Sequence, residues 1–230
     1  DFCLSRGLGD VYKRQECMMC SLLIAVIAVL VTACATNTPP DGISHVTPTS
    51  GANLWQILQQ RPLHLPAPRP GSPCPTTHGH RVIPELGFLL GNGPVYADFS
   101  GSGPNGNELG ILQYADAQSF AGGGSHWGGQ KVIFFINPTY QGPVLIRGRQ
   151  LDGPGMIRFN GSNDPPNVSD QALLTELRLM GDMGGAPWPS GGSYTRLQTP
   201  GCYAYQVDGL TFSYSIIFKA IPVHITFPKA

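Results

Sequence analysis

Short apolar runs separated by clusters of glycine and proline constrain the fold of this chain more than any other feature. The sequence holds 30 glycines and 22 prolines among its 230 residues. Between them, Lys131–Ile136 (KVIFFI) is almost entirely β-branched and aromatic, as expected for a central strand covered on both faces. In Phe212–Lys219 apolar and polar residues alternate, as they do in a half-buried strand. Because these runs do not alternate with long amphipathic helices, the pattern predicts an all-β domain.

Tight turns are expected between the strands. Asp208-Gly209 lies in a short connection between two clear strands, which predicts a hairpin over Cys202–Lys219. Asn137–Gly142 is predicted to join its flanking strands in the same way. Leu173–Leu179 also fits a short helix, although we favour a strand. The predicted strands are Glu85–Leu90, Val95–Phe99, Ile111–Tyr114, Lys131–Ile136, Val144–Arg149, Met156–Phe159, Leu173–Leu179, Ser193–Gln198, Cys202–Asp208 and Phe212–Lys219.

The C-terminal part of the chain resembles known β-proteins. Pro200–Gly209 (PGCYAYQVDG), followed by a strand, resembles the last hairpin of immunoglobulin-like sandwiches. It also resembles a group of uncharacterised bacterial exported lipoproteins that end in this way. The resemblance covers roughly Gly129–Lys219 and implies an immunoglobulin-like β-sandwich. It implies no particular function, since this fold hosts many.

The N-terminal part reads as an export signal. Residues 1–15 (DFCLSRGLGDVYKRQ) resemble a translated sequencing-adapter artefact, so we exclude them from the interpretation of the fold. Residues 16–33 are predicted to be a signal peptide. Their apolar run, Met18–Val31, is short for the ~20 residues that a membrane-spanning helix needs.

A candidate lipid attachment site follows this run. Val31–Cys34 (VTAC) resembles the lipobox of bacterial lipoproteins, which implies cleavage before Cys34 and a diacylglycerol on its thiol. An ordinary signal peptide cut at the same position is the alternative. Residues 34–51 are rich in Thr, Pro, Ser and Asn and are predicted to be a flexible, lipid-anchored tether. Residues 52–230 are then expected to form a single β-sandwich domain.

The start of this domain is expected to lie along its surface. Asn53–Gln60 fits one short helix that Pro62 ends, and Leu63–Pro75 is too rich in proline to be other than extended. Of the six cysteines, only Cys74 and Cys202 remain once the N-terminal region is set aside. In an oxidising compartment such a pair predicts one disulfide, and two separate buried thiols are the alternative.

The sequence contains only incomplete matches to the motifs that bind nucleotides or carry a catalytic nucleophile. Gly101–Gly106 matches GxGxxG but lacks the helix that would hold a pyrophosphate. Ser125 is adjacent to His126, but a nucleophile elbow needs glycine where Trp127 stands. We interpret this second segment as a loop and predict no nucleotide site.

Metal and nucleic-acid binding are not expected either. Cys74, His78 and His80 lack a second cluster of ligands, and Asn160–Asn167 lacks the acidic density of a calcium site. The formal net charge is +0 and the charged fraction is 12%, which disfavours binding to nucleic acid. We therefore predict no cofactor, no metal and no nucleic-acid partner.

The sequence leaves two functions open. Four aromatic residues in or beside turns are candidates for stacking on a ligand, although they also fit the ends of a hydrophobic core: Trp127, Tyr140, Trp188 and Tyr194. They favour a non-catalytic extracytoplasmic surface module that binds or scaffolds in the bacterial cell envelope, with a glycan or a protein as partner and the membrane reached through the lipid. The alternative is an extracytoplasmic hydrolase acting on glycans, which needs two convergent carboxylates. Its candidates are Glu85, Asp98, Glu108 and Asp116.

Overall fold

A computed structural model describes residues 52–103, 106–122, 124–161, 164–181 and 187–225. The chain divides into two units, Asp1–Val46 and Thr47–Ala230, and everything below concerns the second. The predicted artefact, signal peptide, Cys34 anchor and tether lie outside the described residues. No helix within the described ranges has the length and apolar character needed to cross a bilayer.

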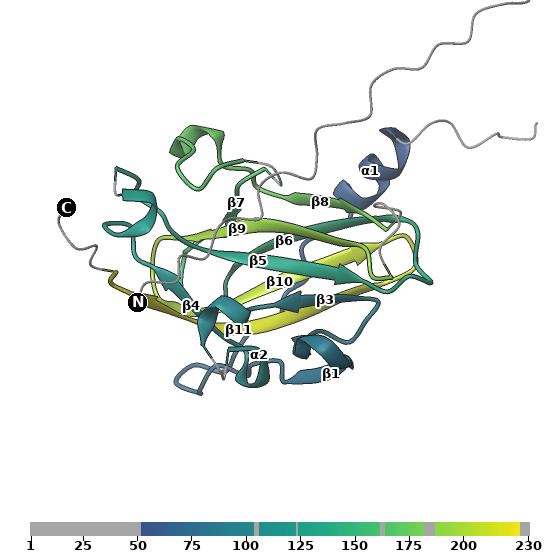
Figure 1. The fold of residues 1–230 in the computed structure, drawn as a ribbon, viewed down its shortest axis with the longest axis horizontal. Coiled ribbons are helices and arrows are strands. Elements are labelled where there is room, and N and C mark those ends of the chain that lie inside the picture. Colours follow the sequence, from purple (N-terminus) through teal and green to yellow (C-terminus); the bar gives the residue numbers. More distant parts are fainter. Residues whose placement is uncertain (1–51, 104–105, 123, 162–163, 182–186, 226–230) are drawn as a thin grey trace, which may run out of the picture. The chain divides into compact units, whose positions relative to one another are not determined.

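The described part is mostly β, with a few short helices (Figure 1). Its elements are α1 (Ala52–Gln59), β1 (Gly79–Ile83), η1 (Pro84–Leu86), β2 (Gly87–Leu90), β3 (Val95–Asp98), η2 (Ser100–Ser102), α2 (Gly106–Leu109), β4 (Ile111–Ala115), η3 (Phe120–Gly122), β5 (Gly128–Ile136), β6 (Pro143–Gln150), β7 (Arg158–Phe159), η4 (Asp170–Ala172), β8 (Leu177–Met180), β9 (Ser190–Leu197), β10 (Gly201–Gly209) and β11 (Ser213–Val223). The predicted short helix is confirmed as α1.

The strands form one large mixed sheet. Its hydrogen-bonded order is β1-β2-β3-β5-β4-β11-β10-β6-β8, with β9 paired to β5 and β7 paired to β9. The pairs are antiparallel except β4 with β11. The predicted all-β character is confirmed, and so is the β10–β11 hairpin, which aligns Asp208 with Ser213. The immunoglobulin-like sandwich stays a prediction.

The second predicted hairpin is wrong. β5 pairs with β3, β4 and β9, whereas β6 pairs with β10 and β8, so the loop Asn137–Gly142 joins two strands that are not neighbours. The reason is visible in the contacts of the loop. The backbone N–H of Asn137 donates to the carbonyl of Pro94, and Tyr140 packs edge-on against Phe212 of the opposite hairpin. These contacts fix the path of the loop between β5 and β6, which lie at different places in the strand order.

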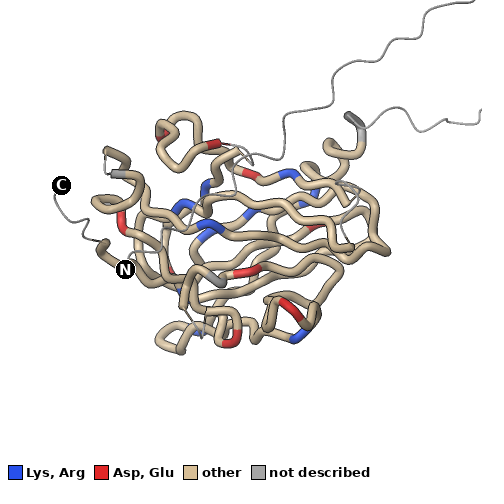
Figure 2. The backbone as a smooth tube through the Cα atoms, in the orientation of Figure 1, with Lys and Arg blue, Asp and Glu red and all other residues tan. Residues whose placement is uncertain are grey.

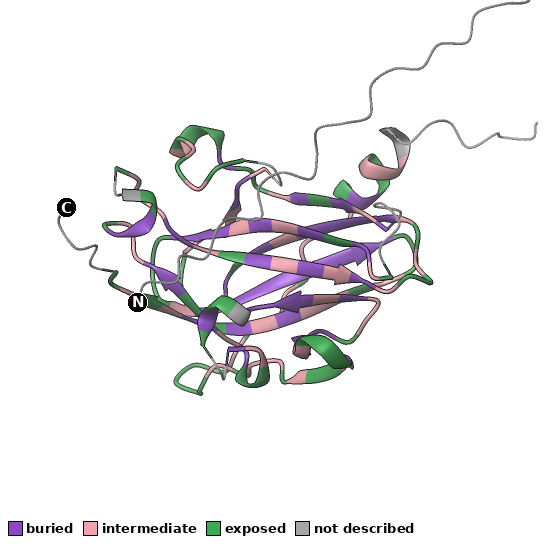
Figure 3. Ribbon diagram, in the orientation of Figure 1, coloured by how far each residue is buried: buried purple, intermediate pink, exposed green. Residues whose placement is uncertain are grey.

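The sheet curls around a shared aromatic core. The Tyr205 ring of β10 lies 5.6 Å from that of Phe134 on β5 and 4.7 Å from that of Phe218 on β11. Its hydroxyl is 2.7 Å from that of Thr195 on β9. Since β10 does not pair with β5 or β9, these contacts can form only if the sheet folds over. Figure 3 shows the buried residues on the strands and the exposed ones on loops and helices.

β10 is buried on both of its faces. Tyr203, Tyr205 and Val207 point into the core, and the residues between them are also buried. Side chains alternate across a strand, so the second face needs its own cover. That cover is the segment Arg61–Thr77, which we name the N-terminal strap.

Polar contacts hold the start of the strap. Arg61 donates to the backbone carbonyls of Gly209 and Phe212 at 2.6 and 2.9 Å, across the end of the β10–β11 hairpin. The Gln206 side chain accepts from the N–H of His64 at 2.6 Å and donates to the carbonyl of Pro62 at 3.0 Å. A polar residue is therefore buried on β10 because the strap satisfies it.

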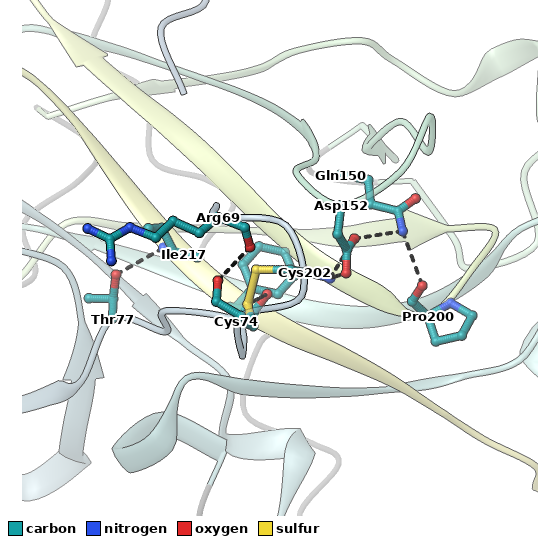
Figure 4. Close-up of a disulfide and its surroundings, with 10 residues drawn as sticks. Arg69, Cys74, Thr77, Gln150, Asp152, Pro200, Cys202 and Ile217 are labelled. Carbon is teal, nitrogen blue, oxygen red and sulfur yellow. Dashed lines mark hydrogen bonds between the residues drawn. A yellow bond between two sulfur atoms is a disulfide. The ribbon is translucent and has the colours of Figure 1, made fainter. Parts of the chain in front are cut away.

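A disulfide holds the other end of the strap (Figure 4). Cys74 and Cys202 are bonded, with their Cα atoms 5.4 Å apart, as the sequence predicts. Beyond it, the N–H of Thr77 donates to the Ile217 carbonyl at 2.8 Å, and the Thr77 hydroxyl accepts from the Ile217 N–H at 2.9 Å. The proline-rich segment is attached where we expect it, beside the beginning of β10. It is not extended throughout, because the N–H of Ser72 donates to the Arg69 carbonyl at 3.0 Å across a turn at Pro70-Gly71.

Candidate functional site

One hollow in the described structure is a groove between α1 and β8. It has a volume of about 540 Å³ and is lined by Gln59, Gly161 and Leu174–Arg178. α1 packs against β6 through its apolar side, where Leu58 is fully buried. The helix therefore lies beside β8, which is the neighbour of β6 (Figure 1).

A small polar network forms one wall of the groove. Oε1 of Glu176 accepts from the Gln59 amide at 2.6 Å and from Nε and Nη2 of Arg178 at 2.8 and 2.7 Å. The Arg178 guanidinium also lies 5.4 Å from the ring centroid of Trp55, within the range of a cation–π contact. Within the described residues, the other Glu176 oxygen and Nη1 of Arg178 have no partner, so the wall offers one acceptor and one donor to a ligand.

The groove also has an apolar side. Leu174 is 44% exposed, an uncommon state for a leucine beside a concave surface. Consecutive residues from Leu174 to Arg178 all line the hollow. Of these, Leu177 and Arg178 belong to β8 and the other three precede it, so the groove lies at the beginning of β8.

A second polar cluster joins the three segments around residues 125, 170 and 196. The Ser125 hydroxyl donates to Oδ1 of Asp170 at 2.6 Å, and Nδ1 of His126 lies 2.9 Å from the other oxygen. Although desolvation acts to raise it, hydrogen bonds from Ser125 and His126 lower the pKa of Asp170. Ser125 bonds to the carboxylate and not to His126, whose side chain is 88% exposed. This is not the hydrogen-bond order of a nucleophile and its base.

Arg196 occupies the centre of this cluster and is fully buried. Nε donates to the Gly128 carbonyl, Nη1 to Asn160 and Pro166, and Nη2 to Ser125 and Trp127. The five N–H groups of a guanidinium are thereby matched by five acceptors. The adjoining hollow has about 110 Å³. Arg196 therefore joins loops and has no donor left for a ligand.

Sequence reasoning missed this cluster because its members are far apart in the chain. Ser125 and Asp170 are 45 positions apart, and Ser125 and Arg196 are 71 apart. An arginine within a strand carries no local sign of burial. The Ser125–His126 pair was visible, but its carboxylate partner was not.

A further carboxylate, Asp116, lies just after β4. It accepts from the N–H of Ser119 at 2.8 Å and from the Ser119 hydroxyl, and Nδ1 of His224 lies 2.9 Å from its second oxygen. These hydrogen bonds, from Ser119 first and then from His224, lower its pKa to about 2. The pair ties the end of β11 to the loop after β4.

The structure does not bring the four candidate aromatic residues together. Tyr194 contacts Phe120, Trp188 contacts Tyr96, and Tyr140 contacts Phe212, each edge-on. No ring contact within the described ranges joins any two of the four candidates: Trp127, Tyr140, Trp188 and Tyr194. Their role in stacking on a ligand stays a prediction.

Tyr140 has a structural role. Its hydroxyl donates to the Pro143 carbonyl at 2.7 Å and accepts from the Leu210 N–H at 3.0 Å. Desolvation raises its pKa, so the hydroxyl keeps its proton.

The acidic candidates lie on separate elements. Glu85 lies in η1, Asp98 in β3 and Glu108 in α2, and Asp98 accepts from the Asn107 amide at 2.7 Å. Groups of three or more side chains suited to hold a metal do not occur among the described residues. Charged residues are scattered along the backbone (Figure 2).

Comparisons with known proteins give only distant likenesses. No protein-family profile matches the chain, and no curated protein matches it. A solved family 123 glycoside hydrolase from Clostridium perfringens, described in work on glycolipid glycan hydrolysis, is 12% identical over 53% of this chain, with a TM-score of 0.27. The chain spans only 24% of that enzyme's length. The CooA pilin subunit of enterotoxigenic Escherichia coli is 9% identical over 58% of this chain and all of its own, with a TM-score of 0.29. Likenesses this weak carry no functional argument.

Proposed function

We propose that the mature chain is a non-catalytic extracytoplasmic module that binds or scaffolds an envelope component through the α1–β8 groove. The observation that carries this proposal is the contrast between the two polar clusters. The donors of Arg196 are all used inside the protein, whereas the groove keeps an unused donor on Arg178, an unused acceptor on Glu176 and an exposed Leu174. A few polar groups beside exposed apolar surface are typical of a binding site.

The proposed location combines the signal peptide, the lipobox and the disulfide. The Cys74–Cys202 bond is typical of an oxidising compartment. The lipid on Cys34 would hold the protein at a membrane, and residues 34–51 would give the domain reach. The module would then act at the membrane surface outside the cytoplasm.

The proposed fold is an immunoglobulin-like sandwich. The strand order β4-β11-β10-β6 supports this proposal. In it β4 pairs in parallel with β11, while β11 with β10 and β10 with β6 pair antiparallel. The crossing loop Asn137–Gly142 supports it as well, since sandwiches join their two layers by such loops.

The hydrolase alternative has no specific observation in its favour. Cleavage of a glycosidic bond needs two carboxyl groups facing each other across the substrate. Each of the three hollows is lined by a single acidic residue: Glu176, Asp152 or Asp170.

Retention on isolated cell envelopes tests the proposal. Leu174→Asp places a charge in the groove, and Leu86→Asp is the matched control, because Leu86 is 41% exposed and lies outside the groove. We expect the exported Cys34→Ala protein, which lacks the lipid, to sediment with envelopes. Leu174→Asp should lower that retention about tenfold, while the control should not. Equal retention of both variants would refute the groove as the binding site.

A further inference from the structure

β8 is one of the two strands that end the hydrogen-bonded path, and its outer edge is open within the described residues. It pairs with β6 alone. The strand at the other end, β1, has a register irregularity between Arg81 and Ile83, a common way of blunting an edge. β8 pairs in a regular register from Leu177 to Met180, so no bulge blunts this edge, although the strand is only 4 residues long.

The register fixes which backbone groups of β8 point outward. The N–H of Gly181 donates to the Gly142 carbonyl at 3.0 Å. Bonded and non-bonded pairs alternate in an antiparallel ladder, so the next pair, Met180 with Pro143, is non-bonded. The absence of an N–H on proline fits this assignment. By the same alternation, the N–H and C=O groups of Met180 and Arg178 point away from β6.

Of these two residues, Arg178 also lines the groove described above, whereas Met180 lies beyond its lining. A row of alternating backbone donors and acceptors is matched by another extended backbone, which repeats the same groups at the same spacing. Gln59 of α1 and Gly161 also line this hollow beside Arg178. Exposed Leu174 suits its apolar side chains, and Arg178 with Glu176 suits its polar ones.

We propose that β8 accepts an extended peptide segment of a partner protein as an additional strand. This inference rests on the proposed function and names the class of partner. Backbone hydrogen bonds to Arg178 and Met180 would supply the affinity, and alternating apolar and polar side chains would supply the preference.

The test uses the exported Cys34→Ala protein and a blocked peptide of alternating valine and threonine with a lysine at each end. Hydrogen exchange should show the peptide protecting the amides of Arg178 and Met180. The same peptide with alternate nitrogens methylated should give no protection, because it lacks the donors. This comparison uses an unaltered β8, so it does not depend on the folding of a variant.

A variant pair tests the same edge from the protein side. Met180→Pro removes an outward N–H that makes no bond to β6, and it should weaken peptide binding about tenfold. Met180→Val keeps the N–H and should bind like the parent protein. Melting curves should show that both variants are folded.

Three results would overturn the inference. One is the absence of amide protection at millimolar peptide, and another is equal protection by the methylated peptide. The third is protection that appears without peptide and rises with protein concentration, which would make a second copy of the chain the occupant. If the peptide fails but Leu174→Asp still loses envelope retention, the proposed function stands and only this inference falls.

Discussion

Removing the Cys74–Cys202 disulfide should cost this domain a large part of its stability. The bond links positions 128 residues apart. The loop-closure relation gives about 16–17 cal/mol/K for a loop of this length, or about 5 kcal/mol at 25 °C. For a domain of roughly 180 residues, the unfolding entropy is about 0.4 kcal/mol/K, so the melting temperature should fall by about 13 °C.

The structure also predicts which part loosens first. Cys202 keeps its backbone bonds to Asp152 and Leu151 without the sulfur, so the start of β10 stays in place. Between His64 and Thr77, the disulfide is the attachment of the strap to the sheet. The Thr77 amide should therefore exchange faster than amides of the central strands.

Urea unfolding of the exported Cys74→Ala/Cys202→Ala variant, with Cys34→Ala as the parent, measures the effect. Because the cross-link restricts the unfolded chain, its removal should also raise the m-value, so the free energy is obtained from the midpoint and the m-value of each protein. A loss below about 1 kcal/mol would refute the reasoning. So would two free thiols in the exported parent protein, titrated under denaturing conditions.

Three other changes have defined outcomes. Cys34→Ala should release the exported protein from detergent extracts into the soluble fraction, whereas the parent should carry a diacylated N-terminal Cys34 in mass spectrometry; an unmodified parent would contradict the lipobox. Arg196→Met should lower the unfolding free energy by about 3 kcal/mol, because five acceptors lose their donor, those of Gly128 and Asn160 on buried residues and the other three partly buried; a loss under about 1 kcal/mol would contradict the joining role. The Asp116 carboxyl should titrate near pH 2 in the folded protein by NMR, and His224→Ala should raise that midpoint. Since the folded pKa is the lower one, the contribution of Asp116 is present above the pKa of the unfolded chain and is lost as the pH falls toward 2; a midpoint near 4 would contradict it.

Local patterns predicted the elements but not the pairing of every strand. The alternation in Phe212–Lys219 and the turn at Asp208-Gly209 correctly gave the β10–β11 hairpin, because a short connection leaves few alternatives. The loop Asn137–Gly142 has similar composition, but it crosses to another part of the sheet. Its path depends on Pro94 and Phe212, which are distant in sequence.

The candidate groove could not have been derived from the sequence. Trp55, Gln59 and Arg178 meet there because α1 packs on β6 and β8 is the neighbour of β6. The four aromatic residues were reasonable candidates for a binding surface, since large rings beside turns are often exposed. In this fold Tyr140, Trp188 and Tyr194 instead contact other rings.

The sequence by itself determined the β character, the absence of helix from the strap and the pairing of Cys74 with Cys202. These follow from short-range chemistry: branched and aromatic residues favour strands, proline excludes helix, and two cysteines leave one intramolecular bond. Only the tertiary structure decided which strands became neighbours, which polar residues were buried and where an open edge remained. Those outcomes depend on contacts between residues far apart in the chain, such as Ser125 with Arg196 or Gln59 with Glu176. Such contacts cannot be inferred from the local sequence around either residue.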